Sequence, residues 1–214
     1  MIKDWSCITT QDTTPYADIC REAVEDDKVF AKFKKDPRYT AILEHVSPEH
    51  GGRYIEGIME YELNDEIIDE FKDNDDIGGA NRVDYGEPFG KVSPSTLRYV
   101  RNALDISYFF GEGELNKIVE IGGGYGGLCK TISCLCDFDE YHLYDIEPAS
   151  KLQEKYLSKF GIKAVHHSVP EETKDIDLLI SNYAYSELGE NLQDLYLSLI
   201  HISEPTRPER IGVG

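Results

Sequence analysis

Lys117–Gly127 reads KIVEIGGGYGG, and the rest of the chain is interpreted around this stretch. Aliphatic residues come before the glycines, as in a short strand that is buried on both faces. The glycines allow the backbone to bend sharply and to lie close to a ligand. A helix is expected to begin near Leu128, so that its first N–H groups face an anionic or polar group. The stretch therefore predicts a strand, a glycine turn and a helix around a binding site.

Two spacings within the turn indicate two classes of ligand. Gly122, Gly124 and Gly127 match the G-x-G-x-x-G spacing of dinucleotide-binding folds, which is a weak signal by itself. The segment also fits acid-x-G-x-G-x-G with Glu120 as the acid, and this pattern resembles the first motif of class I S-adenosylmethionine-dependent methyltransferases. A carboxylate at that position suits the methionyl ammonium group and would repel a pyrophosphate. Glu120 therefore favours S-adenosyl-L-methionine over NAD as the cofactor.

Composition limits the class of protein and its partners. The 214 residues suffice for one domain with a helical extension, and hydrophobic residues at 40% indicate a globular chain. Acidic residues outnumber basic ones by 41 to 22, which gives a net charge of −19. Such a surface repels phosphate backbones and anionic membranes, so we expect no nucleic acid partner and no membrane insertion. The oligomeric state is not predicted.

Cysteine usage and the first residues favour a cytoplasmic protein. The opening MIKDWSCITTQD contains no signal-peptide core, and no segment approaches transmembrane length. Five cysteines, an odd number, do not resemble a secreted disulfide framework. Cys129, Cys134 and Cys136 would be candidates for a metal site, but they fall near one apolar stripe of the helix after the turn. We interpret them as small buried hydrophobic residues and predict no metal.

Residues 1–90 are predicted to form a helical N-terminal lobe that packs on the catalytic domain and shapes the substrate pocket. Its helical segments are expected at 15–35, 39–46, 47–59 and 64–71. The stretch 72–90 is rich in Gly, Asp and Asn and is therefore predicted to be a loop or linker. Its Asp73-x-Asp75 start resembles a calcium loop, but no glutamate closes that loop.

A further helix is predicted from Ser93-Pro94, an N-cap followed by a proline at the first helical position. Its apolar stripe consists of Leu97, Val100, Leu104 and Tyr108. Arg98 and Tyr99 lie off this stripe, so we expect them to be exposed. Because the helix leads directly into the glycine-turn strand, both are candidate substrate-binding residues.

Strands and helices alternate after the turn, which predicts a parallel sheet. The expected elements are helix 128–136, strand 141–144, helix 149–160, strand 162–166, strand 177–180 and helix 188–196. Asp145 follows the second strand, near the spacing of the acid that accepts hydrogen bonds from ribose hydroxyls. Ligands of parallel sheets bind beyond the carboxyl ends of the strands. We therefore expect Gly122–Gly126, Asp145, His167 and Asn182–Glu187 on one rim.

Four segments together resemble the sugar O-methyltransferase family of the class I methyltransferases. They are SPSTLRYVRNALDI, IVEIGGGYGGLC, YHLYDIEP and ISNYAYSEL, and the likeness spans residues 35–196. The resemblance implies a Rossmann-like α/β methyltransferase domain over 91–196. It also implies methyl transfer from S-adenosyl-L-methionine to a hydroxyl of a sugar or glycan. The implied cofactor-binding residues are Glu120, Gly122, Gly124, Tyr125, Gly126, Asp145 and Asn182.

This chemistry requires alignment of donor and acceptor in a dry site, with the cofactor supplying the electrophile. A sugar hydroxyl is weakly acidic, so a general base or a metal would assist the reaction. Glu187, Tyr183 and His167 are candidate catalytic residues because of their place on the rim. Glu187 also suits a helix start, and His167 suits a strand cap. An NAD-dependent oxidoreductase and a catalytically inactive binding module of the same fold remain alternatives.

The segment 197–214 is predicted to be non-native. LSLIHISEPTR at 197–207 resembles the translation of a transposase adaptor used in sequencing libraries, and 208–214 would be read-through of the same DNA. The natural sequence is then expected to continue past Tyr196. The sheet would be truncated at its C-terminal side, with an open edge beside its fourth strand. We therefore expect poor solubility and weak cofactor binding for the chain as written.

Overall fold

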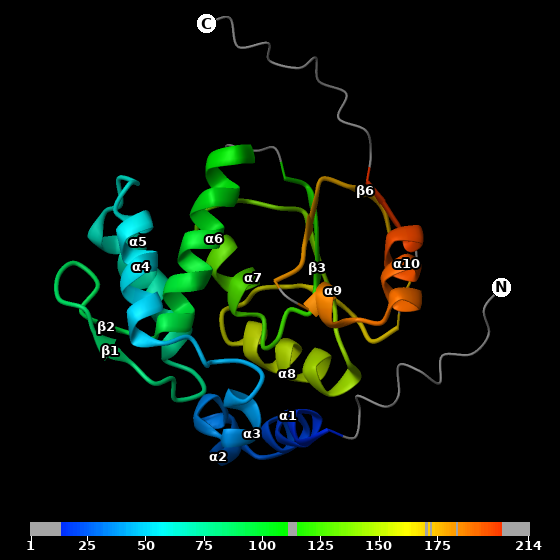
Figure 1. The fold of residues 1–214 in the computed structure, drawn as a ribbon, viewed down its shortest axis with the longest axis horizontal. Coiled ribbons are helices and arrows are strands. Elements are labelled where there is room, and N and C mark those ends of the chain that lie inside the picture. The colour runs from blue at the N-terminus through cyan, green and yellow to red at the C-terminus, as the bar shows by residue number, and fades with distance from the viewer. Residues whose placement is uncertain (1–13, 111–114, 170, 172, 183, 203–214) are drawn as a thin grey trace, which may run out of the picture.

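A parallel sheet forms the centre of the computed structural model, which describes residues 14–110, 115–169, 171, 173–182 and 184–202 (Figure 1). Its strands are β3 (Lys117–Ile121), β4 (Glu140–Tyr144), β5 (Val165–His167) and β7 (Leu178–Ile180). They lie in the order β5-β4-β3-β7, and each neighbouring pair is parallel. The chain first moves from β3 to β4 and β5, and later returns to the other side of β3. This reversal makes a topological switch point between β3 and β7 and confirms the Rossmann-like fold class.

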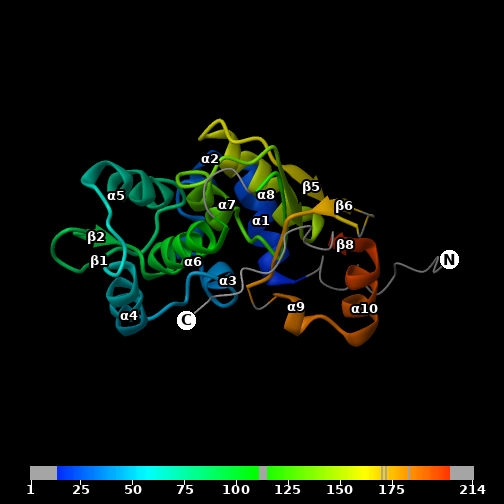
Figure 2. The same cartoon turned by 90° about the horizontal axis from the view of Figure 1, so that it is seen from above.

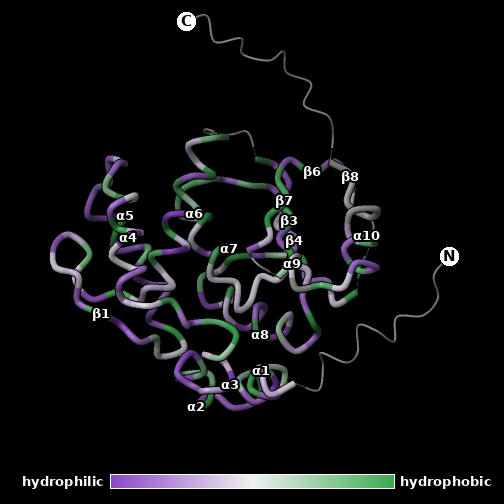
Figure 3. The backbone as a smooth tube through the Cα atoms, in the orientation of Figure 1, coloured by the Kyte–Doolittle hydropathy of each residue, from purple (hydrophilic) through white to green (hydrophobic). Residues whose placement is uncertain are grey.

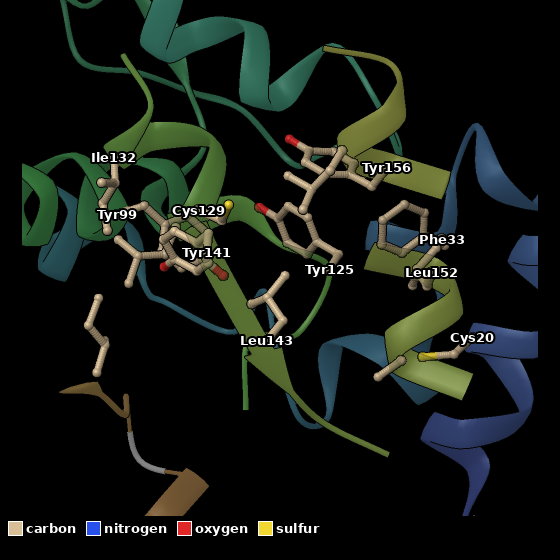
Figure 4. Close-up of a cluster of buried hydrophobic side chains, with 14 of the residues drawn as sticks. Cys20, Phe33, Tyr99, Tyr125, Cys129, Ile132, Tyr141, Leu143, Leu152 and Tyr156 are labelled. Carbon is tan, nitrogen blue, oxygen red and sulfur yellow. The ribbon is translucent and has the colours of Figure 1, made fainter. Parts of the chain in front are cut away.

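Helices cover both faces of the sheet. The helices α7 (Gly127–Ile132) and α8 (Glu147–Ser158) follow β3 and β4, and α10 (Glu190–Leu199) lies on the opposite side of the strands (Figure 1). Side chains of β3 alternate accordingly, because Ile118 packs in the α7–α8 core while Val119 packs in the cluster that includes Tyr196 of α10. Figure 4 shows the first of these cores, in which Tyr125 of the glycine turn lies among aromatic rings.

Residues 14–90 pack in two different places. The helices α1 (Pro15–Glu25), α2 (Asp27–Phe30), α3 (Pro37–Thr40) and the 3-10 turn η2 (Phe33–Lys35) join the core of α7 and α8. The helices α4 (Pro48–Ile58) and α5 (Asp65–Lys72) instead form a second cluster with α6 (Pro94–Phe110). Figure 2 shows this division, with α4 and α5 at the far end of the molecule from α10. Much of the chain in α4, α5 and around β1 is hydrophilic, as expected for an outer layer (Figure 3).

Local capping signals predicted several helix starts correctly. Ser47 accepts a hydrogen bond from His50 N at 3.2 Å and caps α4. Asn64 accepts one from Ile67 N at 2.9 Å and caps α5. Ser93 accepts one from Thr96 N at 3.1 Å at the start of α6. Each of these starts was expected from the residue type and position alone.

Two predicted N-terminal helices are shorter than expected. The segment 15–35 is broken at Asp26, whose backbone is extended and whose side chain instead caps α2 through Lys28 N at 2.7 Å. The segment 39–46 is helical only up to Thr40. An aspartate is a better cap than a helix-interior residue, so the periodic pattern did not prevent the break.

Later segments also differ from the prediction in extent. The helix expected at 128–136 ends at Ile132, and the predicted linker 72–90 contains the 3-10 turn η3 (Asp73–Asp75) and β1 (Val83–Asp84). The structure adds β2 (Lys91–Val92), β6 (Thr173–Ile176) and β8 (Ile200–Ile202), with β6 parallel to β8. Helix α10 and β8 therefore extend into the predicted tail, while 203–214 lie outside the described residues. The non-native origin of that tail stays a prediction.

The structure tests the expectations for the cysteines and describes the helices with respect to a membrane. Cys129 is fully buried, and Cys134 and Cys136 are partly buried, each as a free thiol. Within the described ranges, no set of three or more histidine, cysteine or acidic side chains is placed to hold a metal ion. None of the helices in this part of the chain is both long and apolar enough to cross a bilayer.

Candidate functional site at the carboxyl edge of the sheet

The glycine turn connects β3 to α7 through backbone conformations that only glycine adopts easily. Gly122, Gly124 and Gly126 have φ values of 76°, 60° and 90°, in the left-handed region. Gly122 N donates to Tyr144 O at 2.8 Å, and this bond ties the turn to the end of β4. Gly126 also precedes the first residue of α7. The turn therefore places bare backbone at the switch point beside β7.

Side chains from two distant segments lie directly against this backbone. A Cβ added to Gly122 would lie 2.1 Å from Ala184 Cβ at the start of α9 (Ala184–Glu187). A Cβ added to Gly124 would lie 2.7 Å from Leu43 Cδ1 in the loop after α3. The space in front of the turn is thus filled by Ala184 and Leu43. A ligand that approaches this backbone must displace them.

Glu120 is a buried carboxyl group next to the turn. Its side chain is on the same face of β3 as Ile118, only 2% of the residue is exposed, and Tyr141 Oη donates to Oε2 at 2.7 Å. Burial raises the pKa of Glu120 to about 7, and the nearby Asp145 adds to this, while the Tyr141 hydrogen bond opposes it. A cation beside this group would favour its ionised form.

Asp145 follows β4 and closes the glycine turn from the other side. Its Oδ2 accepts from Gly124 N and from Gln153 Nε2, each at 3.1 Å, and its Oδ1 accepts from Ile146 N at 2.8 Å. Burial raises the pKa of Asp145 to about 7, and these hydrogen bonds partly counter the effect. A carboxylate has about four acceptor positions, so three bonds leave room for one more donor.

Asn182 lies at the end of β7, on the far side of the switch point. Its Oδ1 accepts from Asn102 Nδ2 on α6 at 3.4 Å. Its Nδ2 is buried and has no hydrogen-bond partner in the part of the chain that the structure describes. Since buried donors are rarely left unmet, this amide is suited to a ligand acceptor.

Tyr125 belongs to the turn, but its side chain is in the protein core. Its ring is fully buried and lies 4.8 Å from the ring of Tyr156 and 6.0 Å from that of Tyr99 (Figure 4). Lys34 Nζ lies 4.0 Å from the centre of the Tyr125 ring. The side chain of Tyr125 therefore anchors the turn to α6, α8 and the N-terminal segment.

The prediction that Arg98 and Tyr99 are exposed was wrong. Arg98 is 8% exposed and Tyr99 is 6% exposed. Helix α6 is covered by α4 on one side and by the glycine turn on another, so little of its surface faces solvent. Position off the apolar stripe does not imply exposure when a helix packs against neighbours on several sides.

The three candidate catalytic residues have different outcomes. His167 ends β5, and its Nε2 lies 2.9 Å from His142 Nδ1 while its Nδ1 lies 3.3 Å from Glu171 Oε2. Burial and the neighbouring His142 lower the pKa of His167. Tyr183 lies outside the described residues. Glu187 is the last residue of α9, the short helix whose first residue, Ala184, lies against Gly122 of the turn. The side chain of Glu187 is outside the described part of the structure.

Sequence analysis missed a buried polar network between the N-terminal segment and α6. Asp75 Oδ2 accepts from Ser93 N at 2.6 Å, and Oδ1 accepts from Thr96 Oγ1 at 2.7 Å. Lys34 Nζ donates to Asn74 O at 2.6 Å, and burial lowers the pKa of Lys34 to about 8. The signal was the Asp73-x-Asp75 segment, which resembles a calcium loop in spacing but whose Asp75 is buried and accepts hydrogen bonds from α6 and the residue before it.

The fold of this chain is similar to parts of two solved structures. No protein-family model matches the chain, and no curated protein matches it. Mitomycin 7-O-methyltransferase is 13% identical with a TM-score of 0.39, over 51% of this chain and 35% of that one. A candidate S-adenosyl-L-methionine-dependent methyltransferase from Methanococcus maripaludis is 20% identical with a TM-score of 0.36, over 46% of this chain and 49% of that one. The chain thus spans about half or less of the length of each of these structures. A function for this chain has to be argued from the geometry and chemistry of its own site.

Proposed function

We propose that the chain binds S-adenosyl-L-methionine at the carboxyl end of β3 and takes part in methyl transfer to a hydroxyl of a sugar or glycan. The observation that carries the proposal is the buried Glu120 carboxyl group beside the glycine turn, at the switch point of the sheet. The methyl donor has an ammonium and a sulfonium group, which favour ionised Glu120. The pyrophosphate of NAD would instead bring negative charge to a carboxylate in an acidic protein.

The residues around the turn fit this donor. Gly122 and Gly124 supply backbone without side chains, Asp145 has an acceptor position for a ribose hydroxyl, and Asn182 Nδ2 is an unmet donor. Each group corresponds to a different chemical part of the ligand. Glu120 is the member of this set that separates a cationic amino-acid ligand from a dinucleotide.

When bound, the donor supplies a methyl group on a positively charged sulfur. The chain would align an acceptor hydroxyl with that methyl group and exclude water. Tyr183 and Glu187 remain proposed proton acceptors because both follow β7 in the sequence. His167 is a weaker candidate, because it lies two strands from β3, roughly 10 Å away, and both ring nitrogens face protein groups. The sugar assignment is supported by the sequence resemblance.

Calorimetric titration of the chain with S-adenosylhomocysteine and, separately, with NAD⁺ tests the proposal. S-adenosylhomocysteine retains the ammonium group and the ribose, so it should bind at least ~30-fold more tightly than NAD⁺. Tighter binding of NAD⁺ would support the oxidoreductase alternative. Binding of neither ligand would contradict a nucleotide site at this turn.

Leu43→Ala should tighten S-adenosylhomocysteine binding by about 3- to 10-fold, because Leu43 no longer fills the space at Gly124. The matched control is Ile42→Ala, since Ile42 is the neighbouring residue and is 52% exposed. Calorimetry on both variants measures the effect. Unchanged or weaker binding by Leu43→Ala would mean that the ligand approaches the turn from another side.

A further inference from the structure

A buried glutamine on α8 contacts the carboxyl group that closes the glycine turn. Gln153 is fully buried, and its Nε2 donates to Asp145 Oδ2 at 3.1 Å. Other buried residues of α8, such as Leu152 and Tyr156, pack in the hydrophobic core. An amide among them is unfavourable unless its oxygen and its N–H groups have hydrogen-bond partners. The partners of Gln153 therefore indicate what this glutamine does.

The second partner of Gln153 is His166 on β5. His166 Nδ1 lies 3.2 Å from Gln153 Oε1. Because side chains alternate along a strand, His166 is on the face of the sheet that α8 covers, whereas His167 contacts Tyr144 on the other face. An amide oxygen can only accept a hydrogen bond, so the His166 ring must have its proton on Nδ1. This contact fixes which way the amide of Gln153 is turned.

The two contacts form a directed chain of hydrogen bonds that ends at the glycine turn. His166 donates to Gln153, and Gln153 donates to Asp145, whose Oδ2 also accepts from a backbone N–H of the turn at 3.1 Å. If the amide were reversed, its oxygen would face the carboxylate, and two acceptors repel each other. Burial raises the pKa of Asp145, and the Gln153 hydrogen bond is one of those that oppose this effect. Gln153 thus fixes the direction of the carboxylate and favours its ionised form.

The amide of Gln153 lies at the turn itself. A Cβ added to Gly123 would lie 3.4 Å from Gln153 Nε2 and 3.5 Å from Glu120 Cδ. The amide is therefore close to both carboxyl groups of the proposed donor site. Asp145 is partly exposed and has one acceptor position left, whereas Gln153 is fully enclosed. Gln153 consequently acts on a ligand through Asp145.

We propose that Gln153 and His166 are positioning residues that make the site selective for a ribose with free hydroxyl groups. They hold Asp145 in a fixed direction, and its remaining acceptor position receives a hydrogen bond from a ribose hydroxyl. An acceptor that is fixed before the ligand binds lowers the ordering cost of that hydrogen bond. This inference rests on the proposed function, because the ribose belongs to the methyl donor. It adds two residues that govern selectivity without touching the ligand.

The test compares S-adenosylhomocysteine with its 2′,3′-dideoxy analogue by calorimetry at pH 8. Gln153→Met keeps the length of the side chain but removes the amide, so affinity for S-adenosylhomocysteine should fall about 10-fold. Affinity for the dideoxy analogue should stay within about 2-fold, because that ligand has no hydroxyl for Asp145. An equal loss for both ligands would overturn the inference and leave Gln153 a structural residue. The matched control is Ser158→Met, at an exposed position of the same helix, which should change neither affinity.

Two substitutions of His166 test the other link of the chain. Asparagine retains an N–H donor for Gln153 Oε1, so His166→Asn should keep the wild-type preference for S-adenosylhomocysteine over the dideoxy analogue within about 2-fold. Leucine has no donor, so His166→Leu should lower that preference at least ~3-fold. Nitrogen-15 NMR of the wild-type His166 ring, assigned by its absence from His166→Asn, should show the proton on Nδ1. A proton on Nε2 alone would contradict the chain of hydrogen bonds.

The outcomes separate this inference from the proposed function. If the wild type binds no S-adenosylhomocysteine, the proposed function fails and this inference fails with it. If it binds that ligand no more tightly than the dideoxy analogue, the methyl-donor site stands and this inference is overturned. The inference is also overturned, with the donor site intact, if Gln153→Met or His166→Leu keeps the wild-type preference.

Discussion

Asp75→Ala is expected to lower the free energy of unfolding by about 3–5 kcal/mol, which is a large share of the stability of an ordinary domain. Asp75 is 2% exposed, and its carboxylate accepts hydrogen bonds from Ser93 N and Thr96 Oγ1 at the start of α6. Alanine leaves both donors buried without an acceptor. It also removes the negative charge from the N-terminus of a long helix. Urea denaturation followed by circular dichroism measures the change.

Asp76 provides the matched control for this substitution. It is the next residue, its side chain is 65% exposed, and it pairs with Arg82 on the surface. Asp76→Ala should therefore change the free energy of unfolding by less than about 1 kcal/mol. Asp75→Asn should fall between the two, because an amide keeps one acceptor oxygen. If Asp75→Ala unfolds within ~1 kcal/mol of the wild type, the buried network does not stabilise α6.

Elements set by local chemistry could be predicted from the sequence. The glycines between β3 and α7, the cap Ser47 before Pro48 and the acid Asp145 at the end of β4 each produce their structure through neighbours within a few residues. The parallel pairing of the strands follows from the alternation of strands and helices, because parallel neighbours need a crossover connection. The rim of the candidate site was predictable for the same reason.

The rest depends on contacts between residues far apart in the sequence. Arg98 is buried because α4 and the glycine turn both cover α6, and no local pattern around Arg98 records that packing. Leu43 looks like an ordinary loop residue until it is seen against Gly124, 81 positions later in the chain. The spacing around Asp75 resembles that of a metal-binding loop, whereas its hydrogen-bond partners are Ser93 and Thr96. Sequence spacing thus predicted the glycine turn with Asp145 beside it, but not the contact that Leu43 of the N-terminal segment makes with that turn.

Glu120→Gln is expected to have two opposite effects, a more stable protein at pH 8 and a loss of ligand affinity. The unperturbed pKa of a glutamate is 4.5, and burial raises that of Glu120 to about 7 in the folded chain. Between these two values the folded state binds the proton more strongly than the unfolded state. The stability contributed by protonated Glu120 is therefore complete below pH 4.5 and is lost as the pH rises through 7.

This linkage gives the size of the stability effect. The pKa difference corresponds to about 3 kcal/mol of stability that the wild type loses between pH 5 and pH 8. The raised pKa of Asp145, also about 7, acts in the same direction over the same range. Glu120→Gln removes its own share, so its free energy of unfolding should fall less steeply with pH. Glutamine keeps an acceptor for Tyr141 Oη, which limits any loss from packing.

Ligand affinity should change in the opposite direction, because the ammonium group of the ligand requires a carboxylate. At pH 8, Glu120→Gln should bind S-adenosylhomocysteine about 100-fold more weakly than the wild type, the range expected when a buried charged partner is removed. Wild-type affinity should also decrease below pH 7 as Glu120 becomes protonated, and binding near pH 7 should release protons that calorimetry detects in buffers of different ionisation enthalpy. Glu154→Gln, on the exposed side of α8, is the control and should alter neither property. If Glu120→Gln is stabilised at pH 8 yet binds the ligand normally, Glu120 is only a buried acid and the ammonium group binds elsewhere.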